Sequence, residues 1–175
     1  MDAAVQLIAR QGYDATSVEA IAESADVARQ TFFNYFPSKD AVVHAWVDQR
    51  RAQVREVLQA DGEQDAVDRL AAAMRRLAAV YEADADTSRA MVRSWIRCGG
   101  PLHPDATGTA DLFVEVLNAG RDAGQLDPAL DPQVAAQLLL DAYLGVLYRW
   151  AAGGGHLHQQ LEAAVSVLSA GLRHR

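Results

Sequence analysis

The sequence predicts an all-α protein in which a compact N-terminal head of three short helices precedes a larger helical bundle. No run of β-branched residues alternates with polar residues, whereas apolar residues recur three and four positions apart along the whole chain. The expected helices are short before residue 38 and long after it, which favours a head followed by a bundle. About nine helices are expected from the glycine and proline breaks, which fall at 12, 36–38, 61–62, 99–101, 124–132 and 153–155.

The composition is that of a globular protein. Half of the 175 residues are apolar, so the chain can bury a sizeable core. The apolar stretches end well short of the roughly 20 residues that cross a bilayer, and no basic start precedes a hydrophobic run. We therefore expect a cytoplasmic protein with no membrane partner. Cys98 is the one cysteine, which excludes an internal disulfide and favours a buried or idle thiol.

The charge excludes broad electrostatic binding to nucleic acid. The net charge is -7, and residues 1–40 hold three basic side chains against six acidic ones. Affinity for phosphate depends on lysine and arginine side chains that replace counterions. Any DNA binding by this chain must therefore depend on a few specific contacts.

Residues 17–36 have the pattern of a helix-turn-helix. Thr16 and Glu19 fit a capping box in which the Thr16 side chain accepts from the backbone of Glu19, so a helix is expected to begin near Ser17. A second short helix, from Arg29 to Phe36, has an apolar back and a hydrogen-bonding front. Such a helix can read base edges in the major groove, although a helical hairpin in an ordinary core would show similar stripes.

The order of residues is more specific than this pattern. The sequence resembles the N-terminal domain of the TetR family of repressors over residues 3–43, through Gly12-Tyr13, Thr16-Ser17-Val18, Ile21-Ala22, Ala25, Val27 and the run from Thr31 to Asp40. The resemblance implies a DNA-binding domain at 1–43 and a ligand-binding and dimerisation domain at 44–175.

The resemblance also implies which side chains meet double-stranded DNA. Thr16 and Ser17 would present a helix N-terminus to a phosphate, where free N–H groups favour an anion. Tyr35 and Lys39 fall at phosphate-contacting positions. The groove-facing positions are Arg29, Gln30, Thr31, Phe33 and Asn34.

Three residues depart from the family pattern. Asp26 stands where the turn usually has glycine, and aspartate tolerates a left-handed backbone better than most residues. Ala28 replaces the usual Ser or Thr, which removes a helix cap worth about 1 kcal/mol. Phe33 lacks the hydroxyl of the usual tyrosine. The chain also begins where the middle of the first helix is expected, and one hypothesis is that a basic N-terminal segment precedes it.

The last two expected helices indicate a homodimer. Between Val134 and Trp150 few residues are strongly polar, so this helix must be covered on more than one side. The resemblance implies a four-helix bundle with the same helices of a second chain, although the helix could instead be the centre of a monomeric bundle. The expected interface residues are Leu138, Tyr148, Leu161, Val165 and Leu168.

The resemblance further implies a cavity for a small-molecule effector that is largely apolar. Asp141 is a carboxylate within an apolar helix, and it either binds a polar ligand group or pairs with Arg97 or Arg149. The expected cavity residues are Tyr81, Met91, Trp95, Phe113, Asp141, Tyr143 and Leu144.

Catalytic and metal-binding patterns are not found in the sequence, and no cofactor is expected. His156 and His158 are two positions apart and cannot share a helix face as zinc ligands four apart would. The sequence therefore predicts a ligand-responsive repressor that binds a palindromic operator as a homodimer and is released by its effector. The alternative is a helical carrier or interaction module that has lost DNA binding.

Overall fold

The computed structural model describes residues 1–59, 65–100 and 108–172, and in these ranges the chain forms nine helices and no β-strand. The all-α prediction is confirmed. The head contains α1 (Asp2–Gln11), α2 (Val18–Ser24) and α3 (Arg29–Tyr35). The body contains α4 (Lys39–Gln59), α5 (Ala66–Glu82), α6 (Ala85–Arg97), α7 (Thr109–Asp122), α8 (Pro132–Ala151) and α9 (Leu157–Leu172).

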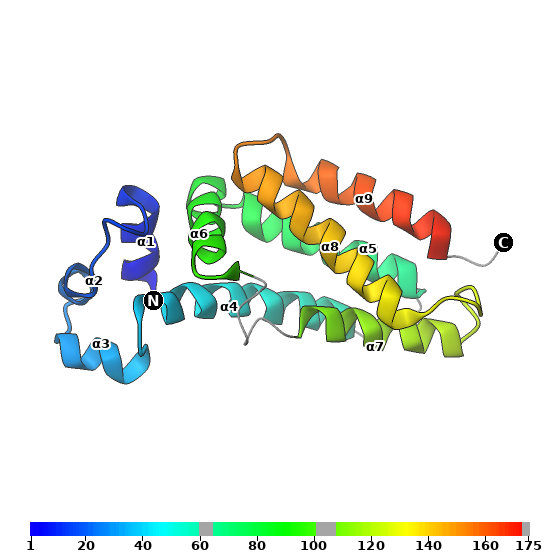
Figure 1. Ribbon diagram of the computed structural model, residues 1–175, viewed down its shortest axis with the longest axis horizontal. Coiled ribbons are helices and arrows are strands. Elements are labelled where there is room, and N and C mark those ends of the chain that lie inside the picture. Colours follow the sequence, from blue (N-terminus) through cyan, green and yellow to red (C-terminus); the bar gives the residue numbers. More distant parts are fainter. Residues whose placement is uncertain (60–64, 101–107, 173–175) are drawn as a thin grey trace.

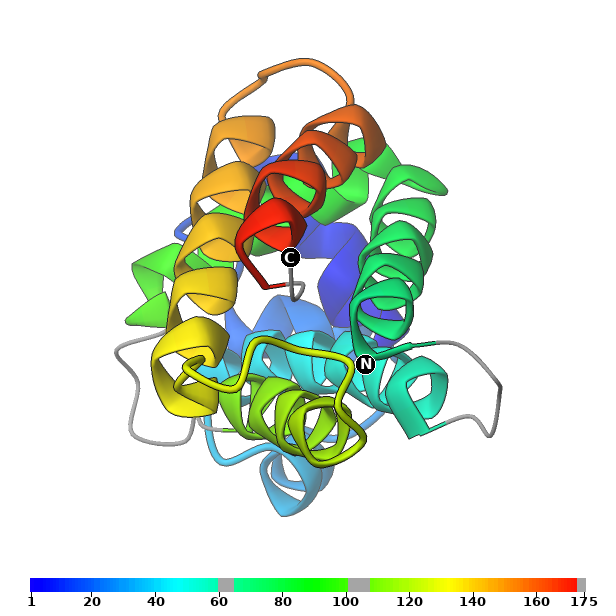
Figure 2. The same cartoon turned by 90° about the vertical axis from the view of Figure 1, so that its right-hand side faces the viewer.

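The head lies at one end of an elongated molecule (Figure 1). Helix α4 leaves the head and runs along the body, and the chain ends at the opposite end. Figure 2, viewed from that opposite end, shows α9 lying between α5 and α8, with α4 and α7 beneath them. Helix α6 packs against α1, α4 and α8, so it stands between the head and the bundle.

Several local predictions are confirmed. Pro132 is the first residue of α8, and Asp131 Oδ1 accepts the N–H of Gln133 at 2.9 Å. Asp26 has a φ of 52°, the left-handed conformation expected at the turn between α2 and α3. Helix α3 begins at Arg29 after Ala28, which provides no side-chain cap.

The predicted capping box is wrong. Ser17 is the N-cap of α2, and its Oγ accepts the N–H of Ala20 at 3.1 Å. Thr16 is 1% exposed, and its hydroxyl donates to the carbonyl oxygen of Gly12 at 2.7 Å. Because Thr16 points inward, it fixes the loop after α1 and leaves the cap to its neighbour.

Two hydrophobic cores meet along α1 and α4. On α4, Val42 lies in the core of the head, whereas Val43 and Trp46 lie in the core of the body. On α1, Ala4 and Ile8 are divided in the same way. The two cores therefore share two helices, and a domain boundary at 43/44 remains a prediction.

At Gly120, α7 lies very close to the start of α5. A Cβ at this position would lie 2.4 Å from the Cβ of Ala66. We predict that Gly120→Ala lowers the free energy of unfolding by about 1–3 kcal/mol, because the two helices must separate to admit a methyl group. Urea unfolding followed by circular dichroism measures the change. Glu115→Ala, on the exposed face of α7, is the control, and wild-type stability in the Gly120 variant would contradict this packing.

Candidate DNA-binding head and effector cavity

Helix α3 has one face in the core of the head and the other in solvent. Phe32 is buried, and its ring centroid lies 5.5 Å from that of Phe33 and 5.8 Å from that of Phe36. The outer face carries Gln30 and Asn34, which are exposed and joined by a hydrogen bond of 3.3 Å. An amide can donate and accept at once, so this face retains groups of both kinds for base edges.

The other residues predicted to face the groove or contact phosphates differ in their exposure and in the contacts that hold their side chains. Tyr35 is 77% exposed, so its hydroxyl is accessible to a phosphate. Arg29 forms an ion pair of 3.0 Å with Glu19 of α2, and its guanidinium carbon lies 5.4 Å from the Phe33 ring centroid. Because both charged groups are mostly exposed, this pair holds Arg29 only weakly. Thr31 and Phe33 are half-buried.

Lys39 is used inside the head, which sequence reasoning did not predict. Its Nζ donates to the carbonyl oxygens of Tyr13 at 2.6 Å and Thr16 at 2.7 Å, and it lies 3.9 Å from the Tyr13 ring centroid. The ammonium has three N–H groups, and two of them are engaged. Lys39 therefore joins the start of α4 to the loop between α1 and α2.

The same loop is joined to the body. The Tyr13 hydroxyl donates to Asp40, and burial together with this hydrogen bond raises the pKa of Tyr13. Asp14 forms an ion pair of 2.8 Å with Arg97 at the end of α6. The loop thus contacts the first turn of α4 and the last turn of α6.

A small cavity lies between α4, α5, α6, α7 and α8. Its volume is about 70 Å³, well below the roughly 300 Å³ at which pockets for small ligands begin. Five of the predicted cavity residues line it: Tyr81, Trp95, Phe113, Tyr143 and Leu144. The remaining lining residues are Val47, Arg50, Arg51, Val54, Met74, Leu77, Thr109, Leu140 and Leu147.

Two predicted cavity residues are not among those that line this space. Met91 is fully buried in the core of the body. Asp141 is exposed and accepts a hydrogen bond from Gln137 at 2.9 Å. The expected pairing of Asp141 with Arg97 is wrong, because Arg97 pairs with Asp14. Solvent can therefore hydrate the Asp141 carboxylate, and the apolar helix does not have to bury a charge.

Two arginines of α4 were missed by the sequence analysis. Arg51 is 15% exposed, and its Nε donates to Thr109 Oγ1 at 3.1 Å while a terminal nitrogen pairs with Asp48 at 2.8 Å. The Arg50 guanidinium carbon lies 3.3 Å from the Trp46 ring centroid, and its Nε is buried without a hydrogen-bond partner among the described residues. Burial lowers the pKa of Arg50. Arg51 meets Thr109 of α7 and Arg50 lies near Tyr81 of α5, contacts between helices that the spacing along α4 does not indicate.

The aromatic wall of the cavity is hydrogen-bonded. Burial raises the pKa of both Tyr81 and Tyr143, and a hydrogen bond joins the two hydroxyls. The described lining residues include two arginines and no acidic side chain. The cavity therefore joins an apolar wall to two arginines, of which Arg51 is paired with Asp48, a residue that does not line the cavity.

Comparison with known proteins identifies the architecture. The family described as "Bacterial regulatory proteins, tetR family" matches residues 1–46. The crystal structure of Thermus thermophilus FadR, a TetR-family transcriptional repressor in complex with lauroyl-CoA, aligns with 99% of this chain and 93% of its own, at a TM-score of 0.73 and 29% identity. Residues 1–46 of this chain therefore match the TetR family, and the described chain has the fold of a TetR-family repressor.

Curated relatives extend the similarity beyond the head. The transcriptional repressor KstR of Rhodococcus jostii is 26% identical over 156 residues, which are 86% of this chain and 70% of KstR. The A-factor receptor protein of Streptomyces griseus is 25% identical over 149 residues, 83% of this chain. The chain spans about half the length of the latter protein (51%).

None of the described helices is long and apolar enough to cross a membrane.

The last two helices of this chain expose apolar side chains. Leu138 is 55% exposed on α8, and Val134 and Val167 are more exposed still. Leu161, in contrast, is 2% exposed within the core of its own chain, so its prediction as an interface residue is wrong. Tyr148 is half-buried beside Trp95, with ring centroids 6.3 Å apart.

Val165 and Leu168 are half-buried on α9 and pack against the core of the body. They stay predicted interface residues, as does Leu138.

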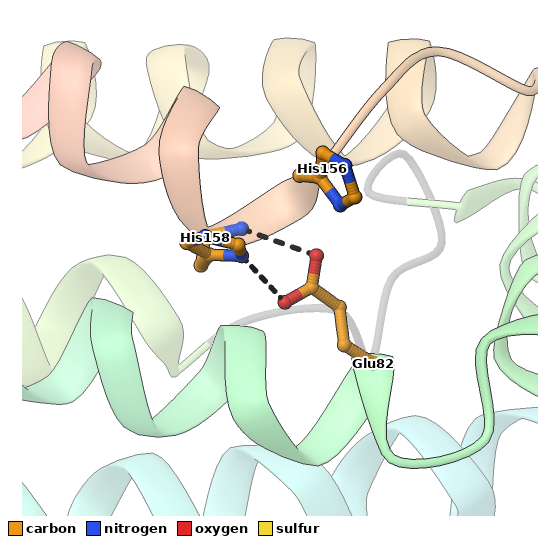
Figure 3. Close-up of side chains that lie close together, drawn as sticks. All are labelled: Glu82, His156 and His158. Carbon is orange, nitrogen blue, oxygen red and sulfur yellow. Dashed lines mark hydrogen bonds and ion pairs between the residues drawn. The ribbon is translucent and has the colours of Figure 1, made fainter.

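A second group of side chains, at the start of α9, was not expected to converge. His156 directly precedes α9, so helical geometry does not turn its ring away from that of His158. Both rings approach Glu82 of α5 (Figure 3).

The internal role of Lys39 has a distinct signature in DNA binding. We predict that Lys39→Met destabilises the head by about 1–3 kcal/mol, because two carbonyl oxygens lose a charged donor. Operator affinity should fall while the slope of log affinity against log salt stays unchanged. A phosphate contact would instead lower that slope by about one. Arg10→Met removes an exposed charge from the head and is the control for net charge.

Proposed function

We propose that this chain is a ligand-responsive transcriptional repressor that binds a palindromic operator as a homodimer. The observation that carries the proposal is the exposed, hydrogen-bonding face of α3 on a head whose other helices pack behind it. Gln30, Asn34 and Tyr35 offer amide and hydroxyl groups at positions where a major-groove helix meets bases and phosphates.

The exposed apolar residues of α8 and α9 support a dimer. Leu138 and Val134 are one helical turn apart on α8, and Val167 lies on the neighbouring α9. Burying these side chains against their copies in a second chain would remove apolar surface from water and close a two-fold axis. Two heads related by that axis would match the two halves of a palindrome.

The cavity supports an effector with an apolar chain and an anionic group. The FadR of Thermus thermophilus was solved with lauroyl-CoA, a ligand that joins such a chain to an anionic head. Here the apolar part would lie along Trp95, Phe113 and Leu144, and the anion would pair with Arg50 and Arg51. Since the cavity is about 70 Å³, such an effector must move the walls as it enters.

Movement of the walls would reach the head through two helices. Helix α4 carries Val47 and Val54 in the cavity wall and Lys39 in the head. Helix α6 carries Trp95 in the wall and Arg97 on the loop of the head. A larger cavity therefore favours a different head position, and DNA and effector oppose each other through a coupling free energy.

Selection from random duplex DNA, followed by gel retardation with the recovered sequence, tests the DNA-binding part. The expected result is a palindrome bound by two chains. Failure to recover any specific duplex with a folded protein would favour the carrier or interaction module over the repressor.

The effector is tested by competition with the operator complex. Lauroyl-CoA and dodecanoic acid should release DNA, whereas dodecanol of equal chain length should act at least about tenfold more weakly, because it brings no charge to the arginines. Arg51→Gln and Arg50→Gln should weaken the anionic effectors by about tenfold or more without changing operator affinity in their absence. The control Arg55→Gln alters an exposed arginine of α4. Equal potency of acid and alcohol would contradict this assignment.

The dimer surface is tested by charge insertion. We predict that Leu138→Glu shifts the chain to a monomer at micromolar concentration, because two carboxylates would have to be buried facing each other. Ala119→Glu on the exposed face of α7 adds the same charge elsewhere and should leave the mass unchanged. Light scattering coupled to size exclusion measures both, and a dimeric Leu138 variant would place the interface on another surface.

A further inference from the structure

We propose that Glu82, His156 and His158 form a binding site for a divalent transition-metal ion, with Zn²⁺ as the best match. The three residues come from the end of α5, the loop before α9 and the first turn of α9. Figure 3 shows both imidazole rings turned toward the carboxylate of Glu82. One ligand atom from each residue lies within 4.8 Å of the other two.

The carboxylate is already oriented by backbone donors. Glu82 Oε1 accepts the N–H of Leu157 at 2.6 Å and the N–H of His158 at 3.4 Å. The second oxygen, Oε2, lies 3.0 Å from Nδ1 of His158. Metal sites commonly fix their carboxylate ligands through hydrogen bonds of this kind. The backbone thus holds Oε1, and Oε2 faces the His158 ring.

The rings can close on an ion with small movements. Tetrahedral zinc binds nitrogen and oxygen at about 2.0–2.2 Å, which places neighbouring ligand atoms roughly 3.3 Å apart. Both histidines are exposed, so rotation of their side chains meets little packing. The ring centroids of His156 and His158 lie 5.7 Å apart at an angle of 49°, so neither ring covers the other.

The donor set selects the class of metal. Two imidazoles and one carboxylate suit zinc and its neighbours in the first transition row, whereas Mg²⁺ and Ca²⁺ require mostly oxygen ligands. Arg89 brings a positive charge close by, since its guanidinium donates to the carbonyl oxygen of Gly155 at 3.4 Å. A site with one carboxylate beside an arginine gains little from charge alone, so coordination by imidazole must supply most of the affinity.

A bound ion would join α5 to the start of α9. The polar contact there now consists of the Glu82 cap and its pairing with His158, which suffice for the start of a helix. His156 has no place in that cap, because its ring precedes the helix. Its position beside the carboxylate is what a metal site explains and a helix cap does not.

Titration of the full chain, freed of any affinity tag, with Zn²⁺ alone tests the proposal by calorimetry. The expected result is one ion per chain and a rise in melting temperature, since an ion bound only by the folded state stabilises it. Mg²⁺ should bind detectably less. Co²⁺ should give the visible absorption bands of a tetrahedral nitrogen and oxygen site.

Variants identify the ligands. His156→Ala and His158→Ala should each weaken Zn²⁺ binding by about tenfold or more, and Gln159→Ala, an exposed neighbour on α9, should bind as the wild type. Circular dichroism in the presence of a chelator checks that each variant is folded. Wild-type affinity in either histidine variant, or no Zn²⁺ binding by the unmodified chain, would overturn the site and leave Glu82 as a helix cap.

Discussion

The packing of α4 into two hydrophobic cores is the constraint on which the structure depends. Val42 and Val43 are adjacent in the chain, yet one lies in the core of the head and the other in the core of the body. Neighbouring residues of a helix point in directions about 100° apart, so one helix can serve both cores only if they meet along its length. The head cannot move while α4 stays fixed in the body.

Polar contacts add to this constraint at the start of α4. Lys39 holds the loop between α1 and α2 through two carbonyl oxygens, and Arg97 holds the same loop from α6. Farther along, α4 contributes Arg50 and Arg51 to the cavity. In the proposed function, a cavity that expands to admit an effector and a head attached to its walls are the two parts that ligand control of DNA binding requires.

The sequence predicted the features that depend on local chemistry. The left-handed turn at Asp26, the missing cap at Ala28 and the start of α8 at Pro132 are set by residues next to one another in the chain. The apolar back of α3 was predicted for the same reason, since helical spacing places Phe32 and Phe36 together.

The features that were missed depend on contacts between distant segments. Lys39 reaches the carbonyl oxygens of Tyr13 and Thr16, more than twenty positions earlier. Helical spacing shows that one side of a helix is polar but not whether a neighbouring helix covers it. For that reason Asp141 was placed in the cavity and Arg51 was not.

In the proposed mechanism, the effector and the operator favour different positions of the head, and α4 and α6 connect the cavity to the head. The most direct test measures effector affinity by calorimetry with and without saturating operator, and operator affinity with and without saturating effector. Linkage requires the two ratios to be equal, and we expect each ligand to weaken the other by the same factor of about 5–150. Effector affinity that is unchanged by the operator would contradict the coupling through α4 and α6.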